Sequence, residues 1–457
     1  MESDKSVYAV VVIFALVLFI VIGIVAVLIV MPVVKHERTE IEKAQRSNNL
    51  FLSLRRSLAE TFIGDIARVF VREDDDRIEE LKDVEFFDEV AKQERVSYIL
   101  TNGQETSKTG SLEVIHYDDF DNKRSWQDYY LREDDGKRSR VYFERNKEPQ
   151  LISGARLKVE GKSIITRDND EIAIEDYVVE SEGGIASGGE NPNLGEQRTA
   201  VILVNFQDNP VQPITKDDAW NLVFNKLDPN SVNSFYDEVA YEKIFLDGNV
   251  FGWYTLPYSS TSSCHDTYYK AIEAADPDVF FPNYSAIIVM FPYANCPYGG
   301  RATIGNVSIA TDDGTFFGGY EMINGTSLSS PYVVSHEFGH NLGLWHANYW
   351  DCNNSTIGEW QTQCISKEYG DNLDLMGFNL THLNAIHKET LGLFDPSNIL
   401  ETTQAGTYFI EPIETKTRGL KTLKIPAQSG ITYYVEYRRP IGYDSQLTLF
   451  FGPAVYN

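Results

Sequence analysis

The chain has 457 residues, of which 42% are hydrophobic, and its formal net charge is −27. This length is sufficient for two or three folded domains. The negative charge excludes functions that depend on binding nucleic acid or acidic membrane surfaces, because like charges repel. We therefore expect no nucleic-acid partner.

The first candidate element is an uncharged apolar segment. Residues 6–34 contain no charged side chain and are rich in Val, Ile and Leu. Such a segment is long enough to cross a hydrocarbon core about 30 Å thick. The alternative is a cleaved signal peptide, but its apolar stretch is shorter and ends at a small-residue cleavage site, which we do not find. We predict a transmembrane anchor over 1–36, and hence a single-pass membrane protein. Long domains translocate largely regardless of flanking charge, so we expect the rest of the chain outside the cytoplasm.

A helical stalk is predicted next, over 37–95, because Leu54, Leu58, Phe62 and Ile66 recur every four residues and form one apolar stripe.

Short alternating runs punctuated by Gly, Asp and Asn then predict a small all-β domain over 96–180. His116 lies in one of these strands, and we interpret it as an ordinary side chain. Asp118 and Asp119 lack the ligand spacing of a calcium loop, so we interpret them as a solvated acidic loop. Glycine-rich residues 181–195 are typical of a flexible linker.

Strand and helix patterns alternate over 196–395, which indicates a mostly parallel twisted sheet with crossover helices. We expect buried strands at 200–206 and 286–291 and helices at 216–227 and 264–275. Residues 396–457 return to β patterns, at 407–411 and 432–437. We expect a β-rich C-terminal module there, an incomplete β-sandwich.

All four cysteines, Cys264, Cys296, Cys352 and Cys364, fall in the second half of the chain. In an exported domain an even count predicts disulfides. Three pairings are possible, and we favour Cys264–Cys296 with Cys352–Cys364. A cysteine zinc site is the alternative, but no pair has Cys-x-x-Cys spacing.

The most specific motif of the chain is His336-Glu337-x-x-His340-x-x-Gly343-x-x-His346. Two histidines four residues apart on a helix point from one face towards a single metal ion. We expect this helix to begin with Ser330 as its N-cap and Pro331 at its first position. Gly343 can end the helix and turn the chain, so that His346 returns as a third ligand. Three protein ligands and one open position are typical of catalytic Zn²⁺.

This motif resembles the extended zinc motif of the metzincin metallopeptidases, and its surroundings are similar to the gametolysin-type family. The similarity covers about 196–394 and is carried by 200–208, by the run into His346-Ala347 and by Tyr369-Gly-Asp371 before Met376. It implies a metzincin-like α/β catalytic domain with Met376 in a turn beneath the metal.

Two departures from the metzincin pattern matter. Some members have a tyrosine ligand two residues after the methionine, where this chain has Phe378. Many members are kept latent by a propeptide cysteine on the zinc, and no cysteine precedes Cys264.

The residues therefore predict a zinc endopeptidase in which Glu337 is the general base and His336, His340 and His346 hold Zn²⁺. The substrate is expected to be an extended protein or peptide chain along an edge strand of the sheet, with 302–326 as the candidate edge.

The alternative is a surface binding or adhesion protein with an inactive peptidase domain, against which the intact Glu337 and three histidines argue. A serine peptidase is a further alternative, because 325–331 resembles the nucleophile segment of subtilisin-like enzymes. No preceding histidine has the glycine that follows the histidine of that family.

The role of the residues before about 195 stays open, because they could cover the cleft or position the enzyme at the membrane. If they inhibit, a carboxylate or steric cover must do so, since no thiol is present.

Overall fold

A computed structural model describes most of the chain after residue 88. The described ranges are 89–144, 148–166, 170–183, 191–261, 264, 267–353, 364–427, 430–447 and 452–456. Of these residues, 39% lie in strands and 21% in helices. The chain described here is therefore mainly β-sheet.

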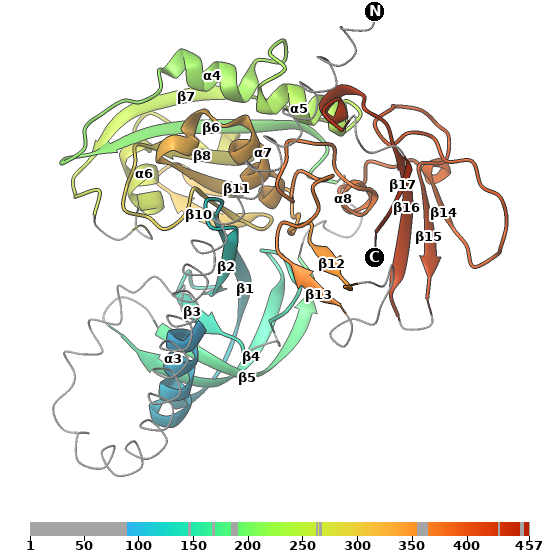
Figure 1. Cartoon of the computed structure of the whole chain (residues 1–457). Helices are drawn as coiled ribbons and strands as arrows, with labels where there is room; N and C mark the ends of the chain where they lie inside the picture. Colours follow the sequence, from blue (N-terminus) through green and yellow to red (C-terminus); the bar gives the residue numbers. More distant parts are fainter. Residues whose placement is uncertain are drawn as a thin grey trace, which may run out of the picture. The chain divides into compact units, whose positions relative to one another are not determined.

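Figure 1 labels the strands and helices in their order along the chain. The first eleven strands are β1 Gln104–Asp119, β2 Arg124–Glu133, β3 Arg138–Tyr142, β4 Arg156–Ile165, β5 Asp170–Ser181, β6 Gly195–Phe206, β7 Ile244–Leu256, β8 Ala286–Phe291, β9 Gly300–Thr303, β10 Val307–Thr311 and β11 Gly314–Asn324. The later strands are β12 Tyr349–Asp351, β13 Ile365–Lys367, β14 Ile399–Glu401, β15 Thr422–Pro426, β16 Thr432–Arg438 and β17 Gly452–Tyr456. The α-helices are α3 Glu89–Asn102, α4 Lys216–Phe224, α5 Val232–Val239, α6 Thr267–Ala275, α7 Pro331–Asn341 and α8 Ala385–Thr390.

One mixed sheet of eleven strands dominates the structure, in the order β2-β3-β5-β4-β1-β9-β11-β8-β6-β7 with β10 beside β11. Parallel pairing is confined to β3–β5, β6–β7, β6–β8 and β8–β11. All other pairs of this sheet are antiparallel.

The expected fold class, a mostly parallel metzincin-like α/β domain preceded by a separate all-β domain, is therefore wrong. Strands β1 to β5, from the predicted small β domain, continue the same sheet because β1 pairs antiparallel with β9. Alternation along a strand indicates that a strand forms, but the partner strand is chosen by tertiary packing.

Helices cover both faces of the parallel part of the sheet because its strands bury alternate residues on opposite sides. Val201 and Leu203 of β6 pack with α4, α5 and α7 in one core. Ala200 and Ile202 pack with α6 in the other. Figure 1 shows α4 and α5 along the face of β6 and β7.

The predicted membrane anchor at residues 1–36 lies outside the described residues, as does most of the predicted stalk at 37–95. No helix in the described part of the chain is long and apolar enough to cross a membrane. Its longest helix, α3, has 14 residues and carries several charges. The prediction of a single-pass membrane protein with its bulk outside the cytoplasm is therefore corrected, because no described helix supports it.

Several local predictions are confirmed. Strands form at β6 and β8, helices at α4 and α6, and a strand at β16, close to the expected positions. Both favoured disulfides, Cys264–Cys296 and Cys352–Cys364, are present. The strand expected at 407–411 is wrong, because those residues have no regular secondary structure. The C-terminal sheet instead has the order β14-β15-β16-β17.

Candidate metal centre

Helix α7 places two of the predicted ligands. It begins at Pro331, and the side chain of its N-cap Ser330 accepts a hydrogen bond from the backbone N–H of Val333 at 3.3 Å, as expected. His336 and His340 are one turn apart and fully buried. Both imidazoles therefore point from the same face of the helix into the protein.

Gly343 brings the third histidine back to this face. Its φ is +93°, a conformation that glycine adopts readily. The N–H groups of Gly343 and Leu344 donate to the carbonyls of His340 and Gly339, at 2.8 and 3.0 Å. This Schellman arrangement ends the helix. His346 Nε2 then lies 3.2 Å from His336 Nε2.

The other ring nitrogen of each histidine is held by an oxygen acceptor. The Nδ1 atoms of His336, His340 and His346 contact the carbonyl of Leu375 at 3.0 Å, the carbonyl of Leu344 at 2.7 Å and the carboxylate of Glu368, respectively. These acceptors require a proton on Nδ1, which leaves each Nε2 lone pair free to bind a metal.

Asp118, at the end of β1, completes the group. Its Oδ1 lies 2.9 Å from His346 Nε2, and its Oδ2 lies 3.4 Å from His340 Nε2. The Tyr369 hydroxyl donates a hydrogen bond to Asp118 Oδ1. Asp118 is fully buried, so its interpretation as part of a solvated loop is wrong.

This donor set fits a metal ion. Ligands at 2.0–2.1 Å in a tetrahedral site are about 3.3 Å apart, close to the separation of the His336 and His346 nitrogens. Among the described residues, His340 Nε2, Asp118 Oδ2 and both oxygens of Glu337 are buried without a hydrogen-bond partner. Buried polar atoms are rarely left unpaired unless a further group satisfies them. A buried histidine and aspartate group that could hold a metal ion is thus present.

His116 also reaches this cluster, so its interpretation as an ordinary side chain is wrong. Its ring centroid lies 4.4 Å from that of His340 and 4.3 Å from that of His346. Its Nδ1 lies 3.0 Å from the side-chain nitrogen of Gln127. His116, Asp118, His340 and His346 together offer four ligand atoms within 4.8 Å of one another.

The electrostatics of the cluster act differently on its imidazoles and on Glu337. Burial lowers the pKa of His336 and His340, and the neighbouring imidazoles lower it further. Burial and the charge of Asp118 raise the pKa of Glu337 well above its usual range. Burial opposes charge on His346, yet Asp118 and Glu368 raise its pKa to about 9. Metal binding at this histidine therefore displaces a proton.

Met376 lies beneath α7, in the position implied by the resemblance. A side chain at Gly339 would place its Cβ 2.5 Å from the Met376 sulfur, so the methionine contacts the helix where only glycine fits. The Tyr332 hydroxyl donates to the carbonyl of Gly377 at 2.7 Å and ties this turn to the same helix.

The sequence reasoning missed Asp118, His116, Glu368 and Tyr369. Of these residues, only Asp118 and His116 show a sequence pattern that could have indicated a shared site. They are two residues apart in a strand, and residues i and i+2 of a strand share one face. Glu368 and Tyr369 show no such pattern, because they reach the site through a loop.

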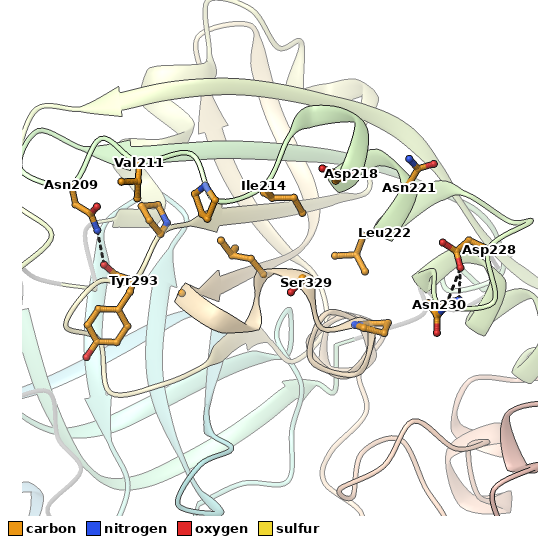
Figure 2. Close-up of a pocket in the computed structure, with 15 residues that line it drawn as sticks. Asn209, Val211, Ile214, Asp218, Asn221, Leu222, Asp228, Asn230, Tyr293 and Ser329 are labelled. Atoms are coloured by element: carbon orange, nitrogen blue, oxygen red, sulfur yellow. Dashed lines mark hydrogen bonds between the residues drawn. The ribbon is translucent and has the colours of Figure 1, made fainter.

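A groove among the described residues lies elsewhere (Figure 2). It has a volume of about 790 Å³ and is lined by segments that follow β6 and β8, including Asn209 and Tyr293, and by the turn before α7. None of the predicted catalytic or metal-binding residues lines it. We therefore place the candidate site at the histidines, where the chemistry converges.

Comparisons with known proteins add little to this geometry. No protein-family model and no curated protein matches the chain. One solved structure, described as a chaperone–substrate complex, is similar over 58% of this chain and 52% of its own, about half its length. The identity is 14% and the TM-score is 0.21, so this likeness carries no argument about fold or function.

Proposed function

We propose that this chain is a metal-dependent peptidase and that its ion is zinc. The observation that carries the proposal is the convergence of three imidazole Nε2 atoms beside a buried, unpartnered glutamate. Neutral imidazoles oriented by oxygen acceptors are the usual donors for zinc. The resemblance of the same motif to that of the metzincins also supports the proposal.

Glu337 is the residue that favours an enzyme over a binding protein. Its side chain is fully buried, and neither oxygen has a hydrogen-bond partner among the described residues. Burying such a group costs stability, and an adhesion surface gains nothing from it. A general base, by contrast, needs a raised pKa close to the working pH.

The proposed mechanism divides the work among few residues. Zinc, when bound, supplies a Lewis acid that polarises the scissile carbonyl and lowers the pKa of water. His336, His340 and His346 would hold it. Glu337 accepts the proton of the attacking water and passes it to the departing amine. Met376 supports the helix from below and donates no ligand.

The substrate would be an extended peptide paired with β9. Strand β9 lies between β11 and β1, so its side towards β1 is the edge of the remaining sheet once β1 is removed. The predicted edge 302–326 begins at Ala302, which is in β9. Most of the range lies in β10 and β11. Strand β11 pairs with β9 on the side away from β1, and β10 pairs with β11. Main-chain pairing on such an edge binds extended chains with little dependence on sequence.

The proposal is tested with the full chain. We expect one zinc ion per chain by metal analysis. After a cut between β5 and β6, which allows β1 to leave β9, we expect hydrolysis of a peptide library that a chelator abolishes and zinc restores. His340→Gln should lose the metal, whereas His382→Gln should keep it, because His382 is buried against Glu238 at 3.0 Å and not at the site. Failure to bind a transition metal in stoichiometric amount would overturn the proposal.

A further inference from the structure

Strand β1 occupies the place of a substrate. It pairs antiparallel with β9, with Ile115 opposite Thr303 and Asp118 opposite Gly300. Backbone hydrogen bonds from Gly299 N–H to the Asp118 carbonyl (2.8 Å) and from Ile304 N–H to the Val114 carbonyl (3.0 Å) extend this pairing. An extended peptide cannot use the same edge while β1 is in place.

Asp118 also lies among the ligand nitrogens. Its carboxylate is 2.9, 3.4 and 4.0 Å from the Nε2 atoms of His346, His340 and His336. The hydroxyl of Tyr369 holds one of its oxygens. A catalytic site needs a fourth coordination position for water, and this carboxylate stands where that position must be.

The surroundings of Asp118 close the site further. The ring of Phe120, two residues on, lies 5.2 Å from His336 and 5.5 Å from Tyr332, measured between centroids. The aromatic ring that follows β1 therefore packs against a ligand histidine and against α7.

The side chain of Glu337 lies against β9, the strand that pairs with β1. A Cβ at Gly300 would lie 2.0 Å from Glu337 Oε1, so the glutamate contacts β9 at Gly300, the residue that pairs with Asp118. The proposed base and the carboxylate of β1 thus face the same point.

We infer that β1 is an internal inhibitor: it fills the substrate edge of β9, and Asp118 is the fourth metal ligand that keeps the peptidase latent. This inference rests on the proposed function. It needs no thiol, and all four cysteines are in disulfides. Activation then requires that β1 leave β9, which a cut in the chain between β5 and β6 would permit.

The first test measures coordination and not activity. The full chain is loaded with Co²⁺, whose visible absorption reports the ligands around the ion. We expect Asp118→Asn and Asp118→Ala to change the spectrum, because a carboxylate ligand is lost. Asp119→Asn is the matched control, because Asp119 bonds to Arg124 and Asn122 and not to the histidines, and it should leave the spectrum unchanged.

The second test measures inhibition. A protease recognition sequence is inserted between β5 and β6, and peptide hydrolysis is compared before and after cutting. We expect at least a tenfold rise that grows on dilution, because the cut strand is then held only by bimolecular association.

Two results would overturn the inference. One is a cobalt spectrum that stays unchanged in both Asp118 variants. The other is an equal, non-zero rate of peptide hydrolysis for the intact and the cut chain at nanomolar concentration. Absence of hydrolysis in both forms, with a spectrum that does respond to Asp118, overturns the proposed function instead and keeps Asp118 as a ligand.

Discussion

Glu337 shows how burial tunes a single side chain for its proposed task. A carboxylate in water has a pKa near 4.3 and is a weak base. Burial and the nearby charge of Asp118 raise the pKa of Glu337 well above this value. The raised pKa makes this carboxylate a stronger base than a carboxylate in water, and peptide-bond hydrolysis requires a group that accepts and returns a proton.

Glu337→Gln should therefore abolish hydrolysis and spare the metal. The amide has nearly the same shape but cannot accept a proton, and general-base catalysis contributes about 10²–10⁴-fold. Hydrolysis is measured after cutting between β5 and β6, and zinc content is measured on the same sample. Turnover within a few-fold of the unsubstituted chain would show that another group is the base.

Glu368 is the second carboxylate with a definite role at residue scale. It accepts a hydrogen bond from Nδ1 of His346, and it is the only side-chain acceptor among the three that orient the motif histidines. Partners of this kind fix the tautomer and raise the basicity of the ligand nitrogen.

Glu368→Ala should weaken zinc binding by about 10–100-fold without preventing it, because the three ligands remain. Affinity is measured by competition with a chelator of known strength. Glu401→Ala, at an exposed position of β14, is the control and should bind zinc normally. Equal affinities of the two variants would remove Glu368 from the site.

The site residues that are close together in the sequence could be predicted, whereas those that come from distant parts of the chain could not. His336, Glu337 and His340 lie on one helix, and Gly343 and His346 follow within a few residues, so their geometry is a property of local backbone structure. Asp118 and Glu368 reach the cluster through strand pairing and a loop. The spacing of His116 and Asp118 indicates a shared strand face, but nothing in the sequence indicates that this face meets the histidines of α7.

At the scale of elements, the end of α7 decides where His346 lies. Gly343 has a φ of +93°, and a Cβ there would meet nothing closer than 3.6 Å, at Ile152. The constraint is therefore conformational and not steric, because L-residues with a side chain rarely adopt this backbone angle.

Gly343→Ala should destabilise the fold by about 1 kcal/mol and also weaken zinc binding, because relaxation of the turn displaces His346. Gly136→Ala is the matched control: its φ is +87° and no atom lies within 4 Å of the added Cβ. Both variants should lose similar stability in urea unfolding, but only Gly343→Ala should lose zinc affinity. A Gly343→Ala protein with normal affinity would show that the turn does not position the ligand.

Helix α8 carries a second electrostatic feature, the buried amine of Lys388. Its Nζ donates to the carbonyl of Val239 at the end of α5 and lies 4.1 Å from the ring centre of Tyr241. Burial, followed by repulsion from Arg438, lowers its pKa from 10.5 to about 7. The folded state thus binds this proton less readily than the unfolded chain does.

The sign of the resulting pH dependence follows from proton linkage. Between about pH 7 and 10 the unfolded chain carries the proton on Lys388 and the folded chain does not, so the free energy of unfolding rises with pH. Below pH 7 the folded state must bear the buried charge, at a cost on the order of a few kcal/mol. Lys388→Met should remove this rise between pH 7.5 and 9.5, which urea unfolding at several pH values can measure. Parallel pH profiles for the two proteins would contradict the lowered pKa.

The elements themselves were more predictable than their arrangement. The strands β6 and β8 could be predicted from the sequence because both are continuous apolar runs. The pairing of β1 with β9 could not be predicted in this way, because many other strands of the chain could pair with either of them. The mixed sheet and the inhibitory strand therefore emerge only when distant parts of the chain are brought together.

At the scale of the whole molecule, the metal group joins residues that are far apart in the chain. Asp118 and His116 come from β1, before the glycine-rich connection, and His340 and His346 come from the helix and loop far beyond it. The eleven-stranded sheet passes through the same junction without a break. Bound metal should consequently stabilise both halves together and not one of them alone.

Removal of the metal should lower the stability of the entire described fold in one step. A ligand that binds only the folded state stabilises it by about 4 kcal/mol at a thousandfold excess over its dissociation constant. Urea unfolding of the full chain, followed by both tryptophan fluorescence and circular dichroism, should shift to lower urea with a chelator, by the same amount for the two probes. Glu337→Gln should show the full shift because it keeps all ligands. Asp118→Ala should show a smaller one, since the link between β1 and the histidines is lost. A chelator that moved only one probe would mean that the two halves unfold independently, and that β1 is not fastened to the site by the metal.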